Sequence, residues 1–248
     1  MSVTLSTSMR LCIDIGNTRI KWGVFDGDEQ VHYDVFERNY ASRLQELLQQ
    51  YDISSSISSS TRRQSKAMEQ LVSSQVKGHI VLDHTVPVPI TNSYETPETL
   101  GRDRLAGVVA AHMSDPTSAH VVIDAGTCIT YDVIDDKGVY LGGNIAPGAH
   151  MRLEAMHQYT DGLPLVDMKL PAADLGTTTE TAIQNGALRG TVMEMQSFVD
   201  MMCDRYSRLN VILTGGDAVF FGELLNTEIF VSPNLIMVGL NEILKHNA

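Results

Sequence analysis

The chain has 248 residues, 43% of them hydrophobic, which is enough to bury a substantial core in one large domain or two small ones. Its formal net charge is −12 and no block of lysine and arginine occurs, which disfavours a nucleic-acid partner. No stretch approaches the roughly 20 apolar residues of a membrane span, and residues 1–10 lack the apolar centre of a signal peptide. We therefore expect a cytoplasmic protein with neither nucleic acid nor membrane as partner.

The first half begins with short strands and tight turns. Apolar runs at 11–13, 20–25 and 31–35 are separated by glycine-containing turns, which predicts a meander of three strands. Leucines at helical spacing predict an amphipathic helix over 44–51. The serine-rich segment 53–60 has isoleucines on one face and predicts a strand rather than a linker. The other elements expected here are a helix over 62–76, a strand over 79–82 and a helix from near Gly101.

The opening arrangement then recurs. A break over 114–118 is followed by a strand that ends at Asp124, a glycine turn, and strands over 129–134 and 139–145. The rest of this half is expected to contain helices over 151–158 and 179–205, strands over 211–213 and 228–231, and a terminal helix from Pro233.

Repetition of this pattern at about half the chain length predicts a duplicated α/β unit. Both turns have the form Asp-x-Gly after a strand, at Asp14 and at Asp124. We place the division at residues 1–117 and 118–248, and expect each half to hold a mixed β-sheet flanked by helices.

The segment from Asp14 to Lys21 carries the first candidate chemistry. An aspartate at a strand end must face a cation, an edge or solvent. The following Gly-Asn-Thr turn offers donors to phosphate oxygens, and Lys21 could lie over a polyphosphate. An ordinary hairpin is the alternative, but two such turns in a duplicated scaffold favour a site for nucleotide phosphates. No Walker GxxxxGK[ST] loop is present.

Two further motifs complete the set. Residues 214–218 (TGGDA) form a third glycine turn, which suits close approach of adenosine. Residues 101–104 (GRDR) place one aspartate between two arginines at a helix start. A capping aspartate with solvated arginines is the structural alternative. The functional interpretation is a carboxylate that takes a hydroxyl proton during attack on a γ-phosphoryl group, beside an arginine that binds an anionic substrate.

Six motifs, taken together and in order, carry a resemblance to a known family. They are DIGNT (14–18), GRDR (101–104), DAGT (124–127), GGNIAPG (142–148), GTTTETAIQNG (176–186) and LTGGDA (213–218). The set spans residues 11–244 and resembles the type III pantothenate kinases. The resemblance implies the duplicated actin-like (ribonuclease H-like) ATPase fold and ATP-dependent phosphorylation of pantothenate to 4′-phosphopantothenate, the first step of coenzyme A biosynthesis.

The resemblance also implies site residues, cofactors and assembly. The ATP-binding residues it implies are Asp14, Ile15, Gly16, Asn17, Thr18, Arg19, Ile20, Lys21 and Thr127. The pantothenate-binding residues it implies are Tyr94, Gly101, Arg102, Asp103, Arg104 and Thr179. Asp103 would be the proton acceptor and Asp124 a ligand of a monovalent cation, potassium or ammonium. Mg²⁺ is expected with ATP, and the family forms homodimers in which Thr179 enters the partner's pocket.

The chain also raises alternatives and departures. Another kinase or polyphosphate hydrolase of this fold would keep the Asp-Gly loops without the GRDR segment, and a nucleotide-dependent regulator or filament-forming relative could lose Asp103. The three cysteines, Cys12, Cys128 and Cys203, lack disulfide or zinc spacing, so we expect small buried residues. Cys128 stands where a smaller residue is expected. A long methionine-rich helix after Thr179 predicts an interface.

Overall fold

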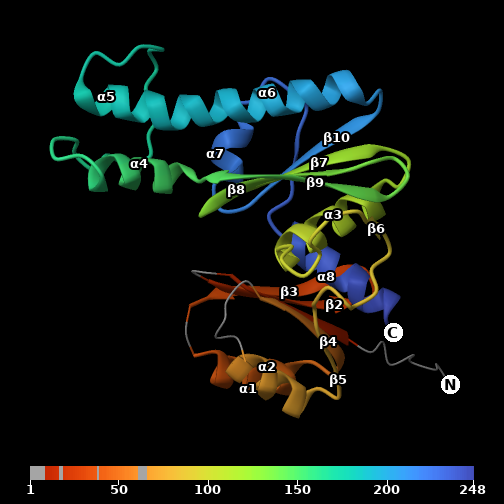
Figure 1. The fold of residues 1–248 in the computed structure, drawn as a ribbon. Coiled ribbons are helices and arrows are strands. Elements are labelled where there is room, and N and C mark those ends of the chain that lie inside the picture. The colour runs from red at the N-terminus through yellow and green to blue at the C-terminus, as the bar shows by residue number, and fades with distance from the viewer. Residues whose placement is uncertain (1–8, 17–18, 38, 61–65) are drawn as a thin grey trace. The chain divides into compact units, whose positions relative to one another are not determined.

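The computed structural model describes residues 9–16, 19–37, 39–60 and 66–248. Asn17 and Thr18, both predicted to bind ATP, lie outside the described residues. Contacts divide the chain into two compact units, one formed by Met1–Ser114 with Asn234–Ala248 and the other by Asp115–Pro233 (Figure 1).

The first unit is built on a sheet with the strand order β3-β2-β1-β4-β5. Its strands are β1 (Met9–Ile15), β2 (Ile20–Asp26), β3 (Glu29–Phe36), β4 (Ile53–Ser60) and β5 (Gly78–Val81). Its helices are α1 (Tyr40–Gln50), α2 (Lys66–Gln75), α3 (Arg102–Ser114) and α8 (Leu235–His246), and a two-residue strand β6 (Thr91–Asn92) precedes α3.

Alternate residues of β1 pack into two different cores, because successive side chains of a strand point to opposite faces. Leu11 and Ile13 join the cluster under α1 and α2, whereas Cys12 joins the cluster formed with α3 and α8. Figure 1 shows these two pairs of helices on opposite sides of the sheet. The serine-rich segment is strand β4 of this sheet, as predicted.

Helix α8 belongs to the first unit, whereas the sequence division placed residues 234–248 in the second half. Leu240 and Ile243 are fully buried in the cluster shared with α3. Polar contacts hold the helix to the opening strands: Arg10 Nε donates to Asn241 Oδ1 at 2.8 Å, and Lys245 Nζ contacts Asp28 Oδ1 at 2.5 Å. Helix α8 packs on the first unit because it covers apolar surface of the first sheet. Its position at the end of the chain, next to the second unit in sequence, does not predict this packing.

The second unit contains a sheet in which β11, β10, β7, β8 and β9 follow one another. The strands are β7 (Ala119–Ala125), β8 (Cys128–Ile134), β9 (Val139–Pro147), β10 (Leu209–Thr214) and β11 (Phe230–Val231). The helices are α4 (Ala149–Gln158), α5 (Thr179–Gln184), the π-helix η1 (Asn185–Arg189), α6 (Gly190–Arg205) and α7 (Ala218–Gly222). The predicted long helix over 179–205 is therefore interrupted by a π-helical turn.

Strand pairing demonstrates the duplication. In the first unit β1 is antiparallel to β2 and parallel to β4, and in the second unit β7 is antiparallel to β8 and parallel to β10. The outer strands correspond too, β3 to β9 and β5 to β11. The prediction of two similar halves, each with a mixed sheet flanked by helices, is confirmed. In the part of the chain that the structure describes, no helix is long and apolar enough to cross a membrane.

Candidate active site

Asp14 lies at the end of β1 with only 5% of its surface exposed. Lys21 on β2 and Ser59 on β4 occupy the neighbouring register positions, so the three residues form a row across the sheet. The Ser59 hydroxyl, itself buried, donates to Asp14 Oδ1 at 2.8 Å. A buried carboxylate thus has a neutral donor on one side and a cation on the other.

The surroundings of Asp14 change its acidity. Burial, which removes water from the carboxylate, and the negative charge of Asp103 together raise the pKa of this carboxyl from 3.8 to about 6. The Ser59 hydrogen bond and the charge of Lys21 oppose that rise. The carboxyl of Asp14 is therefore a weaker acid than an exposed aspartate.

The turn after Asp14 is closed by its own backbone. The Gly16 N–H donates to the Arg19 carbonyl oxygen at 3.1 Å. Ile15 and Ile20, both predicted to contact ATP, have buried side chains in the core under α1 and α2. These two residues can meet a nucleotide only through backbone atoms, whereas the Arg19 side chain is exposed.

Asp103 lies in the first turn of α3, where Oδ1 accepts the N–H of Arg104 at 2.9 Å. The helix-start location agrees with both interpretations of the GRDR segment, but the burial of Arg104 does not fit the solvated arginines of the structural alternative. The guanidinium of Arg104, a buried residue, lies 5.6 Å from the ring centroid of Tyr94, within the range of a cation–π contact. The structure thus brings Tyr94, Asp103 and Arg104 together at one end of α3.

Arg102 contacts the loop that precedes α3. Its guanidinium donates to the backbone carbonyl oxygens of Pro97 at 3.4 Å and Glu98 at 3.2 Å, and also to that of Leu100. Through hydrogen bonds to three carbonyls of the preceding loop, the Arg102 side chain holds the segment that carries Tyr94 and Gly101. The contribution of Arg102 to substrate binding stays a prediction. The partners observed for its guanidinium are the carbonyl oxygens of this loop.

The matching turn of the second unit begins with Asp124, a partly buried residue at the end of β7. Thr130 on β8 and Thr214 on β10 stand at the neighbouring register positions. Gly215 has φ +96°, and a Cβ there would lie 2.4 Å from Asp124 Oδ1, so no other residue fits without displacement. The third glycine turn is thus packed against the second aspartate, and the Asp217 N–H donates to the Ala125 carbonyl oxygen at 2.9 Å.

The expectation that all three cysteines are buried is wrong for two of them. Cys12 is buried, but Cys128 and Cys203 are exposed. Cys128 is the first residue of β8, directly after the exposed Thr127, so the turn leaves its side chain outside the core. The thiol therefore does not crowd the turn.

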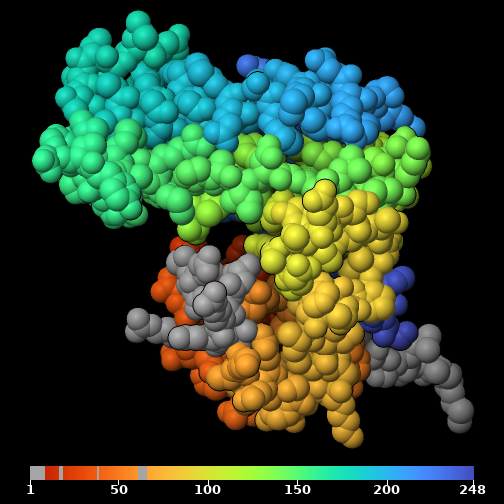
Figure 2. Space-filling model, in the orientation of Figure 1, coloured from red at the N-terminus to blue at the C-terminus, as the bar shows by residue number. Residues whose placement is uncertain are grey.

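Thr179 is the first residue of α5 and is exposed. Thr178 caps this helix, and its hydroxyl accepts the Thr181 N–H at 3.2 Å in a capping box. The cap is therefore made by the neighbours of Thr179. Figure 2 shows α5 and α6 at the surface of the second unit. Leu175, which precedes α5, is 82% exposed, and Met193 on α6 is 64% exposed.

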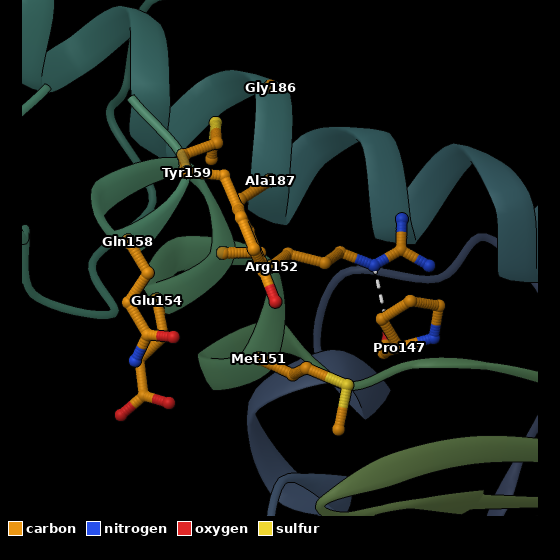
Figure 3. A pocket seen from close by; sticks show the side chains of 10 residues that line it. Pro147, Met151, Arg152, Glu154, Gln158, Tyr159, Gly186 and Ala187 are labelled. Carbon is orange, nitrogen blue, oxygen red and sulfur yellow. Dashed lines mark hydrogen bonds between the residues drawn. The ribbon is translucent and has the colours of Figure 1, made fainter. Parts of the chain in front are cut away.

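A pocket of about 660 Å³ lies within the second unit, between α4 and η1 (Figure 3). Arg152 crosses it, with Nε donating to the Pro147 carbonyl oxygen at 2.8 Å and Nη2 contacting Glu194 at 2.7 Å. Glu194 also accepts the hydroxyl of Tyr131 at 2.8 Å. None of the predicted site residues lines this pocket, and the sequence signal nearest to it is the end of the GGNIAPG motif at Pro147.

Comparison with solved structures shows the fold. A Campylobacter jejuni protein assigned to the Baf family of transcriptional activators is similar with a TM-score of 0.64 at 21% identity, over 96% of this chain and 98% of that one. The inorganic polyphosphate/ATP-glucomannokinase of Arthrobacter sp. strain KM is similar with a TM-score of 0.51 at 13% identity, over 97% and 100%. Together with the duplicated sheets, these similarities identify the actin-like fold that the sequence predicted.

Sequence comparison then gives the family. Residues 10–201 match the profile of the type III pantothenate kinases. A type III pantothenate kinase of Bacteroides fragilis is 42% identical over 240 residues, which cover 96% of this chain and 98% of the relative. One from Flavobacterium johnsoniae is 38% identical over 236 residues, or 94% and 96% of the two chains. The chain belongs to the type III pantothenate kinase family, and the resemblance carried by the six motifs is confirmed.

Proposed function

We propose that Asp103 is the general base with which this chain phosphorylates pantothenate from ATP, the first step of coenzyme A biosynthesis. Family membership supports the reaction. The observation that carries the role of Asp103 is its position at the start of α3, beside Arg104 and Tyr94 and within electrostatic range of the buried Asp14. A base, an anion-binding cation and an aromatic surface are what a small hydroxy acid requires.

The reaction is an in-line transfer. Asp103 accepts the proton of the pantothenate primary hydroxyl as that oxygen forms a bond to the γ-phosphorus, and the bond from the γ-phosphorus to the β–γ bridging oxygen breaks. The products are 4′-phosphopantothenate and ADP. Arg104 orients the pantothenate carboxylate, and Tyr94 and Gly101 shape the same pocket.

In each unit the residues expected to contact ATP belong to a glycine turn. The segment from Asp14 to Lys21 provides backbone donors and a lysine for the phosphates, and Thr127 provides a hydroxyl beside the second turn. The described residues contain no cluster of three or more histidine, cysteine or acidic side chains. That composition fits Mg²⁺ held mainly by phosphate oxygens, where it would neutralise charge as the leaving group departs.

Asp124 would hold the monovalent cation, potassium or ammonium. The groups next to it in the sheet are the hydroxyl residues Thr130 and Thr214. A set of oxygen donors with a single carboxylate suits a hard cation of low charge better than a transition metal. The cation would offset negative charge near the second turn.

We further propose a cytoplasmic homodimer in which Thr179 reaches the pantothenate bound by the partner. The exposed position of Thr179 and the exposed apolar side chains Leu175, Met193 and Met201 support this assembly. Two inactive variants test it: Asp103→Asn mixed with Thr179→Arg. In a mixed dimer one site takes both lesions and the other takes neither, so random exchange restores about a quarter of the sites. A dimer that recovers no activity on mixing contradicts the shared site.

The function itself is tested by ADP release coupled to pantothenate, measured against a panel of small alcohols and sugars. We expect ADP release when pantothenate is the acceptor and none when any other compound of the panel replaces it. Asp103→Asn, purified in the same way, reveals any contaminating kinase. Turnover with a sugar, or none with pantothenate, would contradict the assignment and favour another kinase of this fold.

A further inference from the structure

Ser59 lies far from every motif that identifies the family, yet it touches the first acidic turn. It is 1% exposed and stands beside Asp14 in the parallel pair β1–β4. Its hydroxyl donates to Asp14 Oδ1 at 2.8 Å, and both groups are buried. A hydrogen bond to a buried carboxylate stabilises the ionised form, because that oxygen has lost most of its water.

We propose that Ser59 is a positioning residue whose hydroxyl fixes the Asp14 carboxylate and favours its ionised form. This inference rests on the proposed role of Asp103 as the base. An ionised carboxylate makes a neighbouring acidic group a stronger proton acceptor, because it adds negative charge nearby. Protonation of Asp14 removes that charge, so Asp103 accepts the proton of the substrate hydroxyl less readily.

The charges around Asp14 are few among the described residues. Asp103 on α3 disfavours its ionisation and Lys21 on β2 favours it, while β4 contributes only the neutral hydroxyl of Ser59. Burial, with a smaller contribution from the charge of Asp103, raises the pKa of Asp14 to about 6. A donor that opposes this rise therefore has its largest effect on activity at a pH close to that pKa.

The decisive experiment compares Ser59→Ala with the wild-type enzyme through the pH profile of kcat/KM for pantothenate. A hydrogen bond to a charged group corresponds to about one to two pH units, so we expect the acidic limb to move upward by that amount. Well above the limb, activity should return to within about twofold of wild type. A uniform loss at every pH, or an unmoved limb, would overturn the inference.

Ser58→Ala is the matched control. Ser58 lies on the same strand, is also 1% exposed, and has its hydroxyl 3.2 Å from His79 Nε2 on the other face of the sheet. The Ser58→Ala variant loses the same hydroxyl oxygen from the same strand, so the acidic limb of its pH profile should coincide with that of the wild-type enzyme. Ser59→Cys, a close match in size with a weak donor, should give an intermediate limb, and it decides the matter if Ser59→Ala does not fold.

A readout without substrate separates this inference from the proposed function. Carbon-13 NMR of aspartate carboxyls follows the titration of Asp14, and Asp14→Asn assigns the signal. We expect Ser59→Ala to raise the titration midpoint of Asp14 whichever substrate is phosphorylated. An unchanged midpoint overturns the inference, whereas a raised midpoint in a protein that does not phosphorylate pantothenate overturns only the proposed function.

Discussion

The two aspartate turns share one backbone plan and differ in how each treats its carboxylate. Asp14 and Asp124 each end the central strand of a sheet, with an antiparallel neighbour on one side and a parallel neighbour on the other. Asp14 is buried between Lys21 and Ser59. Asp124 is only partly buried between two threonines. The acid occupies the same position in both sheets, but its neighbours and its burial differ between them.

The different burial of Asp14 and Asp124 indicates different roles for the two carboxylates. A buried carboxylate near a second acid is poised to exchange a proton, so the first turn suits control of the base that takes the substrate proton. A partly exposed carboxylate keeps its access to a ligand. The buried acid of the first turn therefore suits control of the proposed base, and the more accessible acid of the second turn suits the proposed cation.

The largest expected effect comes from the substrate end of the first unit. Asp103→Asn should lower kcat by about 10²–10⁴-fold while ATP binding and the fold persist, because general-base loss has that size. Steady-state kinetics and a nucleotide-binding titration measure both. A variant that keeps more than about half of wild-type kcat would remove Asp103 from the mechanism.

Asp14→Asn should stabilise the protein at pH 8, by on the order of 2–3 kcal/mol, given a folded pKa of about 6 against an ordinary value of 3.8. The sign follows from the raised pKa: the folded state favours the protonated acid, so its stability falls as pH rises from about 4 through about 6. Denaturant unfolding at pH 8 and pH 4 measures this, and the gain should vanish at pH 4.

Asp124→Asn is the control for that difference between the turns. Its side chain is partly exposed, so the same substitution should change the free energy of unfolding much less at pH 8. Equal gains at both positions would mean that burial does not distinguish the two acids.

The glycines of the two turns should also differ. Gly215→Ala must place a Cβ 2.4 Å from Asp124 Oδ1 at φ +96°, and we expect a loss of about 1–3 kcal/mol of stability. In Gly16→Ala the nearest atom of the described residues would be the Arg19 carbonyl oxygen at 3.2 Å, so a smaller loss is expected. Thermal unfolding of the two variants side by side measures the difference, and a larger loss at Gly16 would contradict it.

The smallest effect concerns the second turn alone. Replacing potassium and ammonium by a bulky organic cation at matched ionic strength should lower activity severalfold if Asp124 holds a small monovalent cation. Asp124→Asn should lose that dependence. An unchanged rate of the wild-type enzyme in the organic-cation buffer would exclude the cation site.

The sequence by itself determined the duplicated plan, the order of the strands along the chain and the family. These features are local, because a short apolar run, a glycine turn and an acid within a few residues specify a strand and its return. The six motifs could likewise be recognised without any knowledge of which strands pair. The serine-rich strand was predicted from only two isoleucines on one face, which is enough because alternation has a period of two.

Only the tertiary structure decided which distant residues meet. Ser59 reaches Asp14 because β4 pairs with β1, 45 residues away in the chain. Helix α8 returns to the first unit because apolar surface on α3 and the first sheet was open to it. Arg102 is used by carbonyls of its own loop, which no motif predicts. Burial and hydrogen bonding are settled by pairing between segments, and a linear pattern does not contain that pairing.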